Sequence, residues 1–301
     1  MPNIYQNISS NKRDTVLIMA LFIAIISALA WFIGEYFTEA GGASVLGTAL
    51  IVSGVSGLIS YYNSDKIVLG ISGAKEIKYE DAPEVHNLVD NIAIASGLPK
   101  PKVYIINDSS MNAFATGRDP KHGVLCLTTG IIQRLEKREL EGVIAHEMSH
   151  IGNFDTRLMS IVSILVGGIS LIADWFTRGA FFRGGRRSKD DNSMGSGIIF
   201  LLGIIFLIVS PLIATLIKLA ISRKREFLAD STAAMITRYP KGLANALMKI
   251  SQDTEVLEAA NSATAHLFIS DPVRRNFGNK ISSFFDTHPP ITERIRRLEA
   301  M

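Results

Sequence analysis

Cysteine is almost absent from this sequence of 301 residues, which contains only Cys126. A single cysteine excludes an intramolecular disulfide and suits a reducing compartment. Strong charge is missing as well, because the formal net charge is only +3, and no basic patch is interleaved with aromatic residues. We therefore expect no nucleic-acid partner. The lysines and arginines cluster beside apolar runs, which indicates a membrane surface instead.

Hydrophobic residues are abundant: they make up 48% of the chain and gather in four uncharged runs. The runs are Thr15 to Gly34, Ala40 to Ser64, Leu158 to Ala173 and Asn192 to Ile217. About 20 apolar residues span a bilayer core, so the first, second and fourth runs are long enough, whereas the third has only 16 residues. This pattern predicts an integral membrane protein. The first run exceeds a signal-peptide core of roughly 7–15 residues, so we expect an uncleaved anchor.

Charge around the first two runs predicts their orientation. The link between them, Glu35 to Glu39, carries two acids and no Lys or Arg. The outer flanks carry Lys12, Arg13, Lys66, Lys75 and Lys78. By the positive-inside rule, both ends of this hairpin face the cytoplasm, where the polar sequence that follows also begins.

The alternation of apolar and polar sequence divides the chain into four segments. We expect a transmembrane hairpin over 1–64, a second hydrophobic hairpin over 157–217, and a soluble domain in two parts, 65–156 and 218–301. Helical patterns occur at Asp81–Ser96, Thr128–Leu135, Lys137–Gly152, Ile221–Thr237, Lys241–Ser251 and Ile291–Met301, β-rich runs at Val103–Ile106, Ala113–Thr116 and Val124–Leu127, and a loop composition at Asp271–Phe285. The expected fold class is α+β, a mostly helical membrane protein with four hydrophobic helical segments and a small sheet.

The run His146-Glu147-Met148-Ser149-His150 is the most informative motif. Residues four apart share a helix face, so both imidazoles can converge on one ion. Glu147 lies about 100° round the helix, within reach of a water on that ion. A catalytic zinc ion takes three protein ligands and keeps one position open, and this run supplies two. The alternative reading is a pair of surface histidines beside an exposed glutamate.

A third ligand must come from elsewhere in the chain. The candidates that follow the motif are His266, His288, Glu226, Glu255, Glu258, Glu293 and Glu299. Glu226 is favoured because it follows the fourth apolar run as closely as His150 precedes the third. Asp230 shares its helix face and can accept a ring N–H from a ligating histidine. The alternative is a solvated charge run on an exposed helix.

Four motifs follow one another along the chain. They are Asn112 to Gly117, His146-Glu147-x-x-His150 with Asp155 five residues later, Glu226-x-x-x-Asp230, and Thr287-His288-Pro289-Pro290 with Glu293-Arg294. Together they resemble, over nearly the whole chain, the HtpX family of membrane-bound zinc metalloproteases, relatives of the prenyl-protein (CAAX) endopeptidases. The resemblance implies a zincin-like catalytic domain of the gluzincin type, with one Zn²⁺ bound by His146, His150 and Glu226.

The resemblance also implies roles for residues around the metal. Asp155 and Asp230 would support the ligating histidines, and Arg294 would buttress the loop that precedes it. His288 would donate to the oxyanion; the alternative is a structural histidine fixed by the prolines that follow it.

A substrate-binding strand is implied upstream of the motif. Asn112, Ala113 and Phe114 resemble the family's edge strand beside the cleft, where a substrate adds as an extra strand. The alternative, especially for Phe114, is an ordinary core strand.

The implied function is an endopeptidase that cleaves damaged or misfolded membrane proteins at the cytoplasmic face of the bacterial inner membrane, with protein substrates and the lipid bilayer as partners. Glu147 is the expected general base, which passes a proton from water to the leaving amine. One rival, an intramembrane protease, is disfavoured by the charged residues Arg134, Lys137, Arg138 and Glu141 beside the histidine helix. Two other rivals are a prenyl-protein endopeptidase with the same site and a non-enzymatic, zinc-stabilised membrane scaffold.

The second hydrophobic hairpin gives conflicting signals. His150 and Glu226 can meet at one ion only if the segment between them leaves and returns to one side of the membrane. Two crossings would export a basic loop that contains Arg178, Arg183, Arg186, Arg187 and Lys189, against the positive-inside rule. We nevertheless expect two crossings, because the fourth run is long enough; the alternative is a hairpin packed against the domain.

Overall fold

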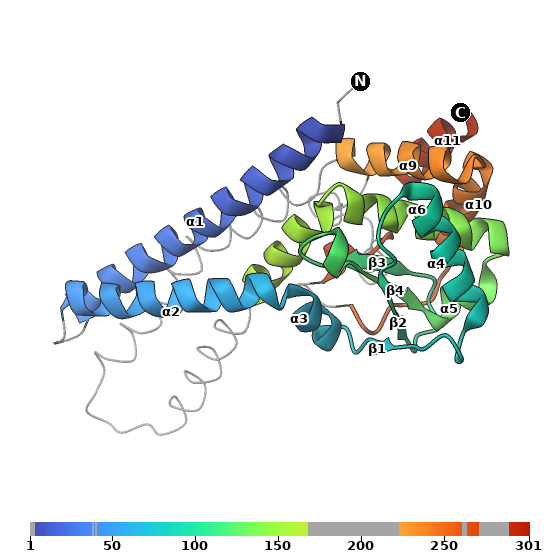
Figure 1. The fold of residues 1–301 in the computed structure, drawn as a ribbon. Helices are drawn as coiled ribbons and strands as arrows, with labels where there is room; N and C mark the ends of the chain where they lie inside the picture. Colours follow the sequence, from blue (N-terminus) through green and yellow to red (C-terminus); the bar gives the residue numbers. More distant parts are fainter. Residues whose placement is uncertain (1–3, 38, 40, 168–222, 261–263, 271–288) are drawn as a thin grey trace.

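The computed structural model describes residues 4–37, 39, 41–167, 223–260, 264–270 and 289–301. Two long helices, α1 (Ile4–Phe37) and α2 (Gly42–Tyr62), lie side by side and project from a domain that contains the strands of the described residues (Figure 1). Within the described residues, they are the two helices long and apolar enough to cross a membrane, over Ile8–Phe32 and Gly42–Tyr62.

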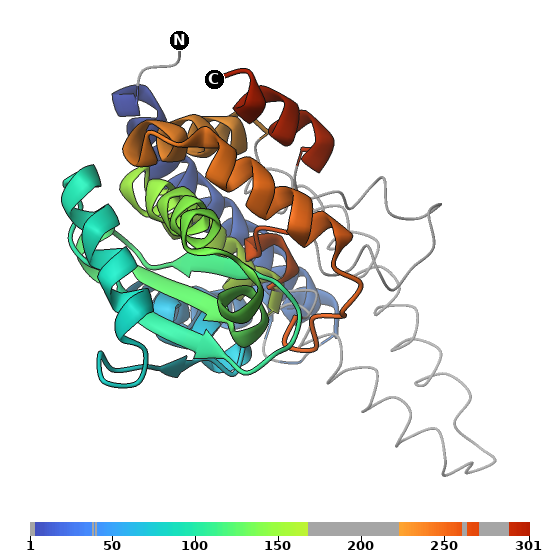
Figure 2. The same cartoon turned by 90° about the vertical axis from the view of Figure 1, so that its right-hand side faces the viewer.

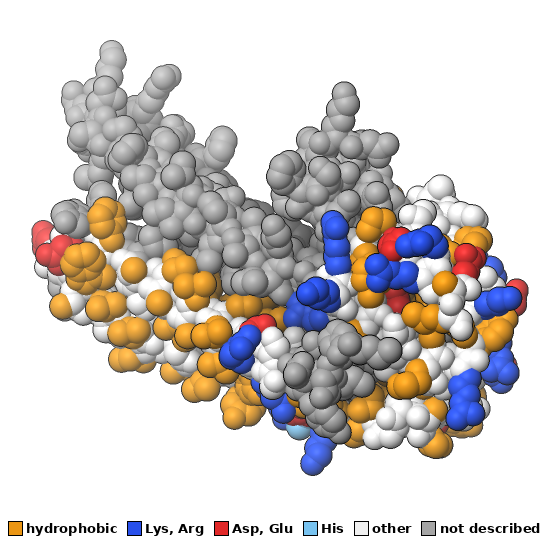
Figure 3. All heavy atoms as spheres, turned by 90° about the horizontal axis from the view of Figure 1, so that it is seen from above, with side chains coloured by type: hydrophobic (Ala, Val, Ile, Leu, Met, Phe, Trp, Pro, Cys, Tyr) orange, Lys and Arg blue, Asp and Glu red, His pale blue; other side chains and the backbone are white. Residues whose placement is uncertain are grey.

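The surface of these two helices is also consistent with membrane-spanning segments. Large apolar side chains such as Leu21, Ile51 and Leu58 are exposed along them, and Figure 3 shows hydrophobic side chains over this arm while charged ones gather on the domain. The first two apolar runs are therefore helical and apolar on the outside, as predicted. The third run is described as helix only up to residue 167, and the fourth run, with the basic loop before it, lies outside the described residues.

The sheet has four strands, in the order β1-β2-β4-β3. They are β1 (Lys75–Glu76), β2 (Lys102–Ile106), β3 (Ala113–Thr116) and β4 (Val124–Thr128), with β2 parallel to β4 and the other pairs antiparallel. The three predicted strands are confirmed, and β3 lies at an edge. Strand β1 escaped prediction because two exposed charged residues carry no apolar alternation. The short helix α3 (Ser64–Ile71), which follows α2, was not predicted either.

Local signals place the helices of the domain. They are α4 (Pro83–Ser96), α5 (Thr129–Arg134), α6 (Lys137–Gly152), α9 (Arg223–Thr237), α10 (Pro240–Gln252) and α11 (Ile291–Glu299), close to the predicted bounds. Helix α4 begins with Pro83 and ends at Gly97, whose φ of 69° is the left-handed conformation that glycine adopts freely. Helix α6 begins with a reciprocal capping box between Glu136 and Glu139.

Helix α6 lies at the centre of the domain, with the sheet on one side and α9 and α10 on the other (Figure 2). Its residues Val143, Ile144 and Met148 are fully buried in the main core. A Cβ at Gly142 would come within 2.7 Å of the Leu243 backbone, so the glycine permits the close approach of α10. Because α6 is buried nearly all round, its polar side chains must find partners inside the protein.

Helix α1 is anchored to the domain at its N-terminal half. Ile18 is buried among Leu158, Ile161 and Val162 of the helix over 155–167, which follows α6. The N-terminal part of α1 therefore lies beside the helix that directly follows the one carrying both motif histidines.

Candidate metal centre

The two motif histidines and Glu226 meet at one buried point. His146 and His150 lie one turn apart on α6, and Glu226 comes from the first turn of α9. The two Nε2 atoms are 3.2 Å apart, and Glu226 places Oε1 3.4 Å from the Nε2 of His150 and Oε2 3.7 Å from the Nε2 of His146. In the described part of the chain, these three residues form the one cluster that could hold a metal ion.

The donor atoms fit a tetrahedral ion. Ligand atoms about 2.0 Å from one tetrahedral zinc ion lie about 3.3 Å from each other, close to the separations found here. Each histidine presents its Nδ1 to a carboxylate: His146 to Asp230 at 3.0 Å, and His150 to Asp155 at 2.9 Å. When the Nδ1 protons bond in this way, both Nε2 lone pairs point at the same spot, which suits a cation.

Burial and neighbouring charges set the protonation of the cluster. Burial, together with the nearby Arg294 guanidinium, lowers the pKa of His146 to about 4, so its ring is neutral, as a ligand must be. Burial also disfavours charge on His150, but Asp155 and the Glu226 carboxylate outweigh it and raise its pKa to about 9. A cation bound here would replace the proton that these carboxylates attract.

Arg294 contacts both Glu226 and Asp230. Its side chain is fully buried, donates to Asp230 from Nε at 2.9 Å and from Nη2 at 2.7 Å, and places Nη1 3.4 Å from Glu226 Oε2. Burial would raise the pKa of Asp230, but Arg294 outweighs it and lowers that pKa to about 2, which keeps the carboxylate charged. The sequence analysis expected Arg294 among the residues around the metal, as a buttress of the loop that precedes it; in the structure it bonds Asp230, which contacts His146.

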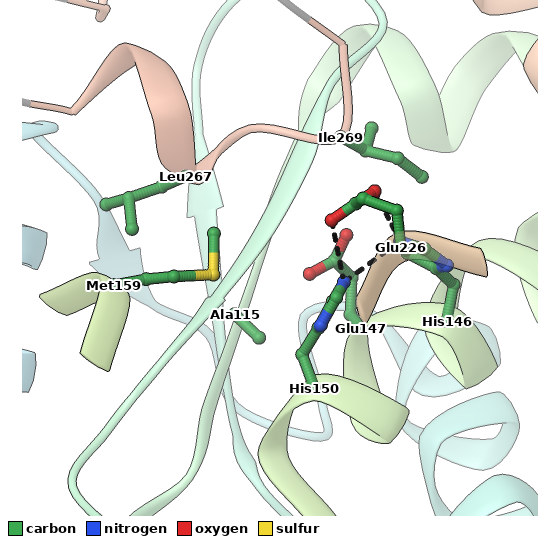
Figure 4. Close-up of a pocket in the computed structure, with 8 residues that line it drawn as sticks. All are labelled: Ala115, His146, Glu147, His150, Met159, Glu226, Leu267 and Ile269. Carbon is green, nitrogen blue, oxygen red and sulfur yellow. Dashed lines mark hydrogen bonds and ion pairs between the residues drawn. The ribbon is translucent and has the colours of Figure 1, made fainter. Parts of the chain in front are cut away.

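A small pocket opens onto the cluster (Figure 4). It is lined by His146, Glu147, His150 and Glu226, and by the apolar side chains of Ala115, Met159, Leu267 and Ile269. The cavity volume is about 10 Å³, which is enough for roughly one water molecule. Figure 4 shows the Glu147 carboxylate directed into this pocket. One wall can therefore do acid–base chemistry, while the other can hold an apolar group.

The edge strand β3 passes beside the pocket, but its first residues already have partners. Ala113 accepts a hydrogen bond from the Ile269 amide at 2.9 Å, and the Asn112 side chain donates to Ser270 O at 3.0 Å. Phe114 is fully buried and packs edge-to-face on Phe268, with ring centroids 5.1 Å apart. None of Asn112, Ala113 and Phe114 lines the pocket, whereas Ala115 does.

The other candidates for the third ligand lie elsewhere. His266 is buried beside Ser163 and the Met159 carbonyl, and Glu293 pairs with Arg296 and Arg297 at the surface. His288 and the predicted loop Asp271–Phe285 lie outside the described residues. Sequence reasoning missed the apolar wall formed by Ala115, Met159, Leu267 and Ile269, because single apolar residues far apart in the chain give no signal of a shared pocket.

The comparisons with known proteins agree with this geometry. A model of peptidase family M48 matches residues 80–301. A protease HtpX homologue from Caldanaerobacter subterraneus is 45% identical over 299 residues, 99% of this chain and 98% of the relative. One from Dictyoglomus thermophilum is 43% identical over 297 residues, 99% of this chain and 94% of the relative.

A solved structure shares the fold. The crystal structure of S. mikatae Ste24p superposes with a TM-score of 0.50 at 18% identity, over 94% of this chain. The superposed region is 62% of the Ste24p chain, so that protein is considerably longer. At this identity the likeness concerns the fold alone.

Proposed function

The chain belongs to peptidase family M48 and is a membrane-bound metalloprotease, and on that premise we propose that its active site is one zinc ion held by His146, His150 and Glu226. The observation that carries this proposal is the convergence of three buried donor atoms, with the Nδ1 atom of each histidine bonded to a carboxylate. Two nitrogens and one carboxylate oxygen leave the open fourth position of a catalytic zinc site.

The surrounding residues then have distinct tasks. When bound, zinc acidifies its water and polarises the scissile carbonyl. Glu147 accepts a proton in the pocket and passes it to the leaving amine. Asp155 and Asp230 orient the histidines, and Arg294 fixes Asp230. For His288, we propose a hydrogen bond to the oxyanion, supported by the resemblance of the Thr287-His288-Pro289-Pro290 motif.

We propose that the substrate binds as an extra strand on β3. Outward-facing backbone groups alternate along an edge strand, so Ala115 faces the same side as Ala113 and lies beside the metal ligands. The segment Ala265–Ser270 bonds to Asn112 and Ala113, and the pocket has room for about one water, so a substrate must shift this segment. An apolar substrate side chain would then contact Met159, Leu267 and Ile269.

We further propose a zincin-like domain built from 65–156 and 218–301, and a site at the cytoplasmic face of the bacterial inner membrane. Support comes from the two apolar helices, the positive residues that flank them, and relatives named as HtpX proteases. Damaged or misfolded membrane proteins are the proposed substrates. In this arrangement the hydrophobic hairpin 157–217 joins the two halves of the catalytic domain and forms two further membrane helices.

The test is zinc content and casein hydrolysis of the detergent-purified full chain beside Glu147→Gln. We expect one zinc per chain in both, and a loss of hydrolysis of about 10²–10⁴-fold in the variant, because glutamine keeps the shape but accepts no proton. Activity within roughly tenfold of wild type would remove Glu147 from the mechanism. A His288→Ala sample should keep zinc and lose about 10²-fold in turnover; unchanged turnover would remove His288 from the mechanism. Hydrolysis only of a prenylated peptide, and not of casein, would favour the prenyl-protein alternative.

A further inference from the structure

Asn11, in the N-terminal part of α1, makes an unusual set of contacts. Its side chain is only 2% exposed. Nδ2 donates to Asp155 Oδ1 at 2.7 Å and to the Asn153 carbonyl at 2.9 Å, and Oδ1 accepts from Arg225 Nη1 at 2.8 Å. Anchoring in a membrane depends on apolar side chains and does not explain a buried, hydrogen-bonded amide on this helix.

The Asp155 carboxylate connects Asn11 to the candidate metal centre. Its Oδ2 accepts the Nδ1 proton of His150 at 2.9 Å, while its Oδ1 accepts from Asn11 at 2.7 Å. Asn11 is therefore separated from a ligating histidine by a single carboxylate. A partner of this kind fixes the tautomer and the ring orientation of a metal-bound histidine.

An amide is the side chain that this position requires. It offers donors to the Asp155 oxygen and the Asn153 carbonyl and an acceptor to Arg225, all at once. Aspartate has the same shape, but its carboxylate has no donor and would face Asp155 with a like charge. Alanine would remove one of the hydrogen bonds that a buried carboxylate needs.

Other contacts hold α1 at this point. Lys12 Nζ lies 4.3 Å from the ring centroid of Phe154, in the turn that precedes Asp155. Further along α1, Ile18 packs on Leu158. Thr15 is also buried, but its hydroxyl bonds the Asn11 carbonyl within the same helix. The candidate span begins at Ile8, so the helix that enters the membrane and the helix that bonds Asp155 are one rigid element.

We propose that Asn11 is a positioning residue of the metal centre: through Asp155 it holds the His150 ring in its ligating orientation. The packing of α1 on the domain would then complete the site. This inference rests on the zinc site proposed above. It assigns α1 a part in forming the active site, in addition to anchoring the chain.

The test measures zinc affinity by chelator competition in the full-length Glu147→Gln protein, which reports on the metal without turnover. Asn11→Asp and Asn11→Ala should each weaken zinc binding by about tenfold, the low end for residues that support a metal ligand. Thr15→Val is the matched control: Thr15 is buried on the same helix, one turn away, and its hydroxyl donates to a carbonyl of that helix. The control should bind zinc like its parent.

Two further readouts separate positioning from general damage. Cobalt-substituted Asn11→Ala should show a changed d–d absorption spectrum, while cobalt-substituted Thr15→Val matches the parent. In the active background, a short peptide should show a lowered kcat at unchanged KM. In a double-mutant cycle, Asn11→Ala should weaken zinc binding little further once Asp155→Asn is present, because both act through the same carboxylate.

The outcomes are distinct. An unchanged zinc affinity in both Asn11 variants, together with an unchanged cobalt spectrum in Asn11→Ala, would overturn the inference and leave the proposed function intact. Equal losses in Thr15→Val, or fully additive losses with Asp155→Asn, would also overturn it, because they indicate a general role in holding the helix. If the parent protein itself binds no zinc, the proposed function fails and this inference fails with it.

Discussion

Arg294 of α11 and Asp230 of α9 form a two-pronged ion pair, with Nε–Oδ2 at 2.9 Å and Nη2–Oδ1 at 2.7 Å. Both residues are buried, and the same aspartate oxygen that accepts from Nη2 lies 3.0 Å from the Nδ1 of His146. A contact between two helices far apart in sequence thereby fixes the orientation of one proposed metal ligand.

Arg294→Ala should destabilise the domain and weaken zinc binding. It leaves the buried Asp230 carboxylate without its main cation, a loss that typically costs roughly 3–5 kcal/mol. The thermal unfolding midpoint in detergent and the zinc affinity of the purified protein measure both effects. The matched control is Arg296→Ala on the same helix, because its pair with Glu293 lies at the surface, where solvent screens the charges and the pair adds little to stability. Equal midpoints for the two variants would contradict a structural role for the buried pair.

Glu226→Ala should lose most of its zinc affinity, because an incomplete set of ligands holds the ion poorly. The matched controls are Glu255→Ala, which removes a surface bond to Ser109, and Glu258→Ala. Both controls should retain one zinc per chain after dialysis against a chelator. Stoichiometric, tightly held zinc in Glu226→Ala would place the third ligand elsewhere in the chain.

Ile269→Ala should change which peptides are cleaved and leave zinc binding unaltered. Ile269 lines the pocket opposite the charged side chains, and removal of its branched chain gives more room to a bulky substrate residue. Apolar pockets discriminate by roughly 10–200-fold per methylene group. The ratio of kcat/KM for peptides with a large and a small apolar residue at the cut should therefore shift by about tenfold. A uniform fall for all peptides would show that Ile269 supports the fold instead.

A cysteine at Ser188 tests whether the second hydrophobic hairpin crosses the membrane. In a Cys126→Ala background, Ser188→Cys should react with an impermeant thiol reagent from the extracytoplasmic side. Native Cys126 is a poor competitor, since it is fully buried and burial raises the pKa of its thiol. A cysteine placed at Lys78 serves as the cytoplasmic control. If Ser188→Cys reacts only after the cytoplasmic face is opened, the hairpin does not span and α1 and α2 are the membrane helices.

The histidine helix was the part of the fold most accessible from sequence. Its bounds, Lys137–Gly152, were predicted as they are found, because helical periodicity is a pattern within a few residues of sequence. The placement of Glu226 and Asp230 on one helix face could be predicted for the same reason, because residues four apart on a helix are close neighbours.

Contacts between distant segments were accessible only where the metal motif or the family resemblance linked the residues, as for His150 and Glu226. Arg294 was expected among the residues around the metal, but its ion pair with Asp230, 64 residues away in the sequence, was not predicted. Asn11 reads as one polar residue ahead of an apolar run, and only the packing of α1 on the helix over 155–167 brings it to Asp155. Such contacts depend on tertiary packing, and the hydrophobic periodicity of the sequence does not show how helices pack on one another.

In the proposed binding mode, a substrate would compete with the protein's own chain for β3, because the Ile269 amide already donates a hydrogen bond to the Ala113 carbonyl. A substrate strand would then gain access only by offering backbone groups that are not already paired. In a folded sheet, the backbone N–H and C=O groups of a strand are hydrogen-bonded to neighbouring strands, whereas in an unfolded chain they are available for pairing. Discrimination between intact and damaged proteins would thus arise from competition for one sheet edge, with no need for the protease to read a sequence.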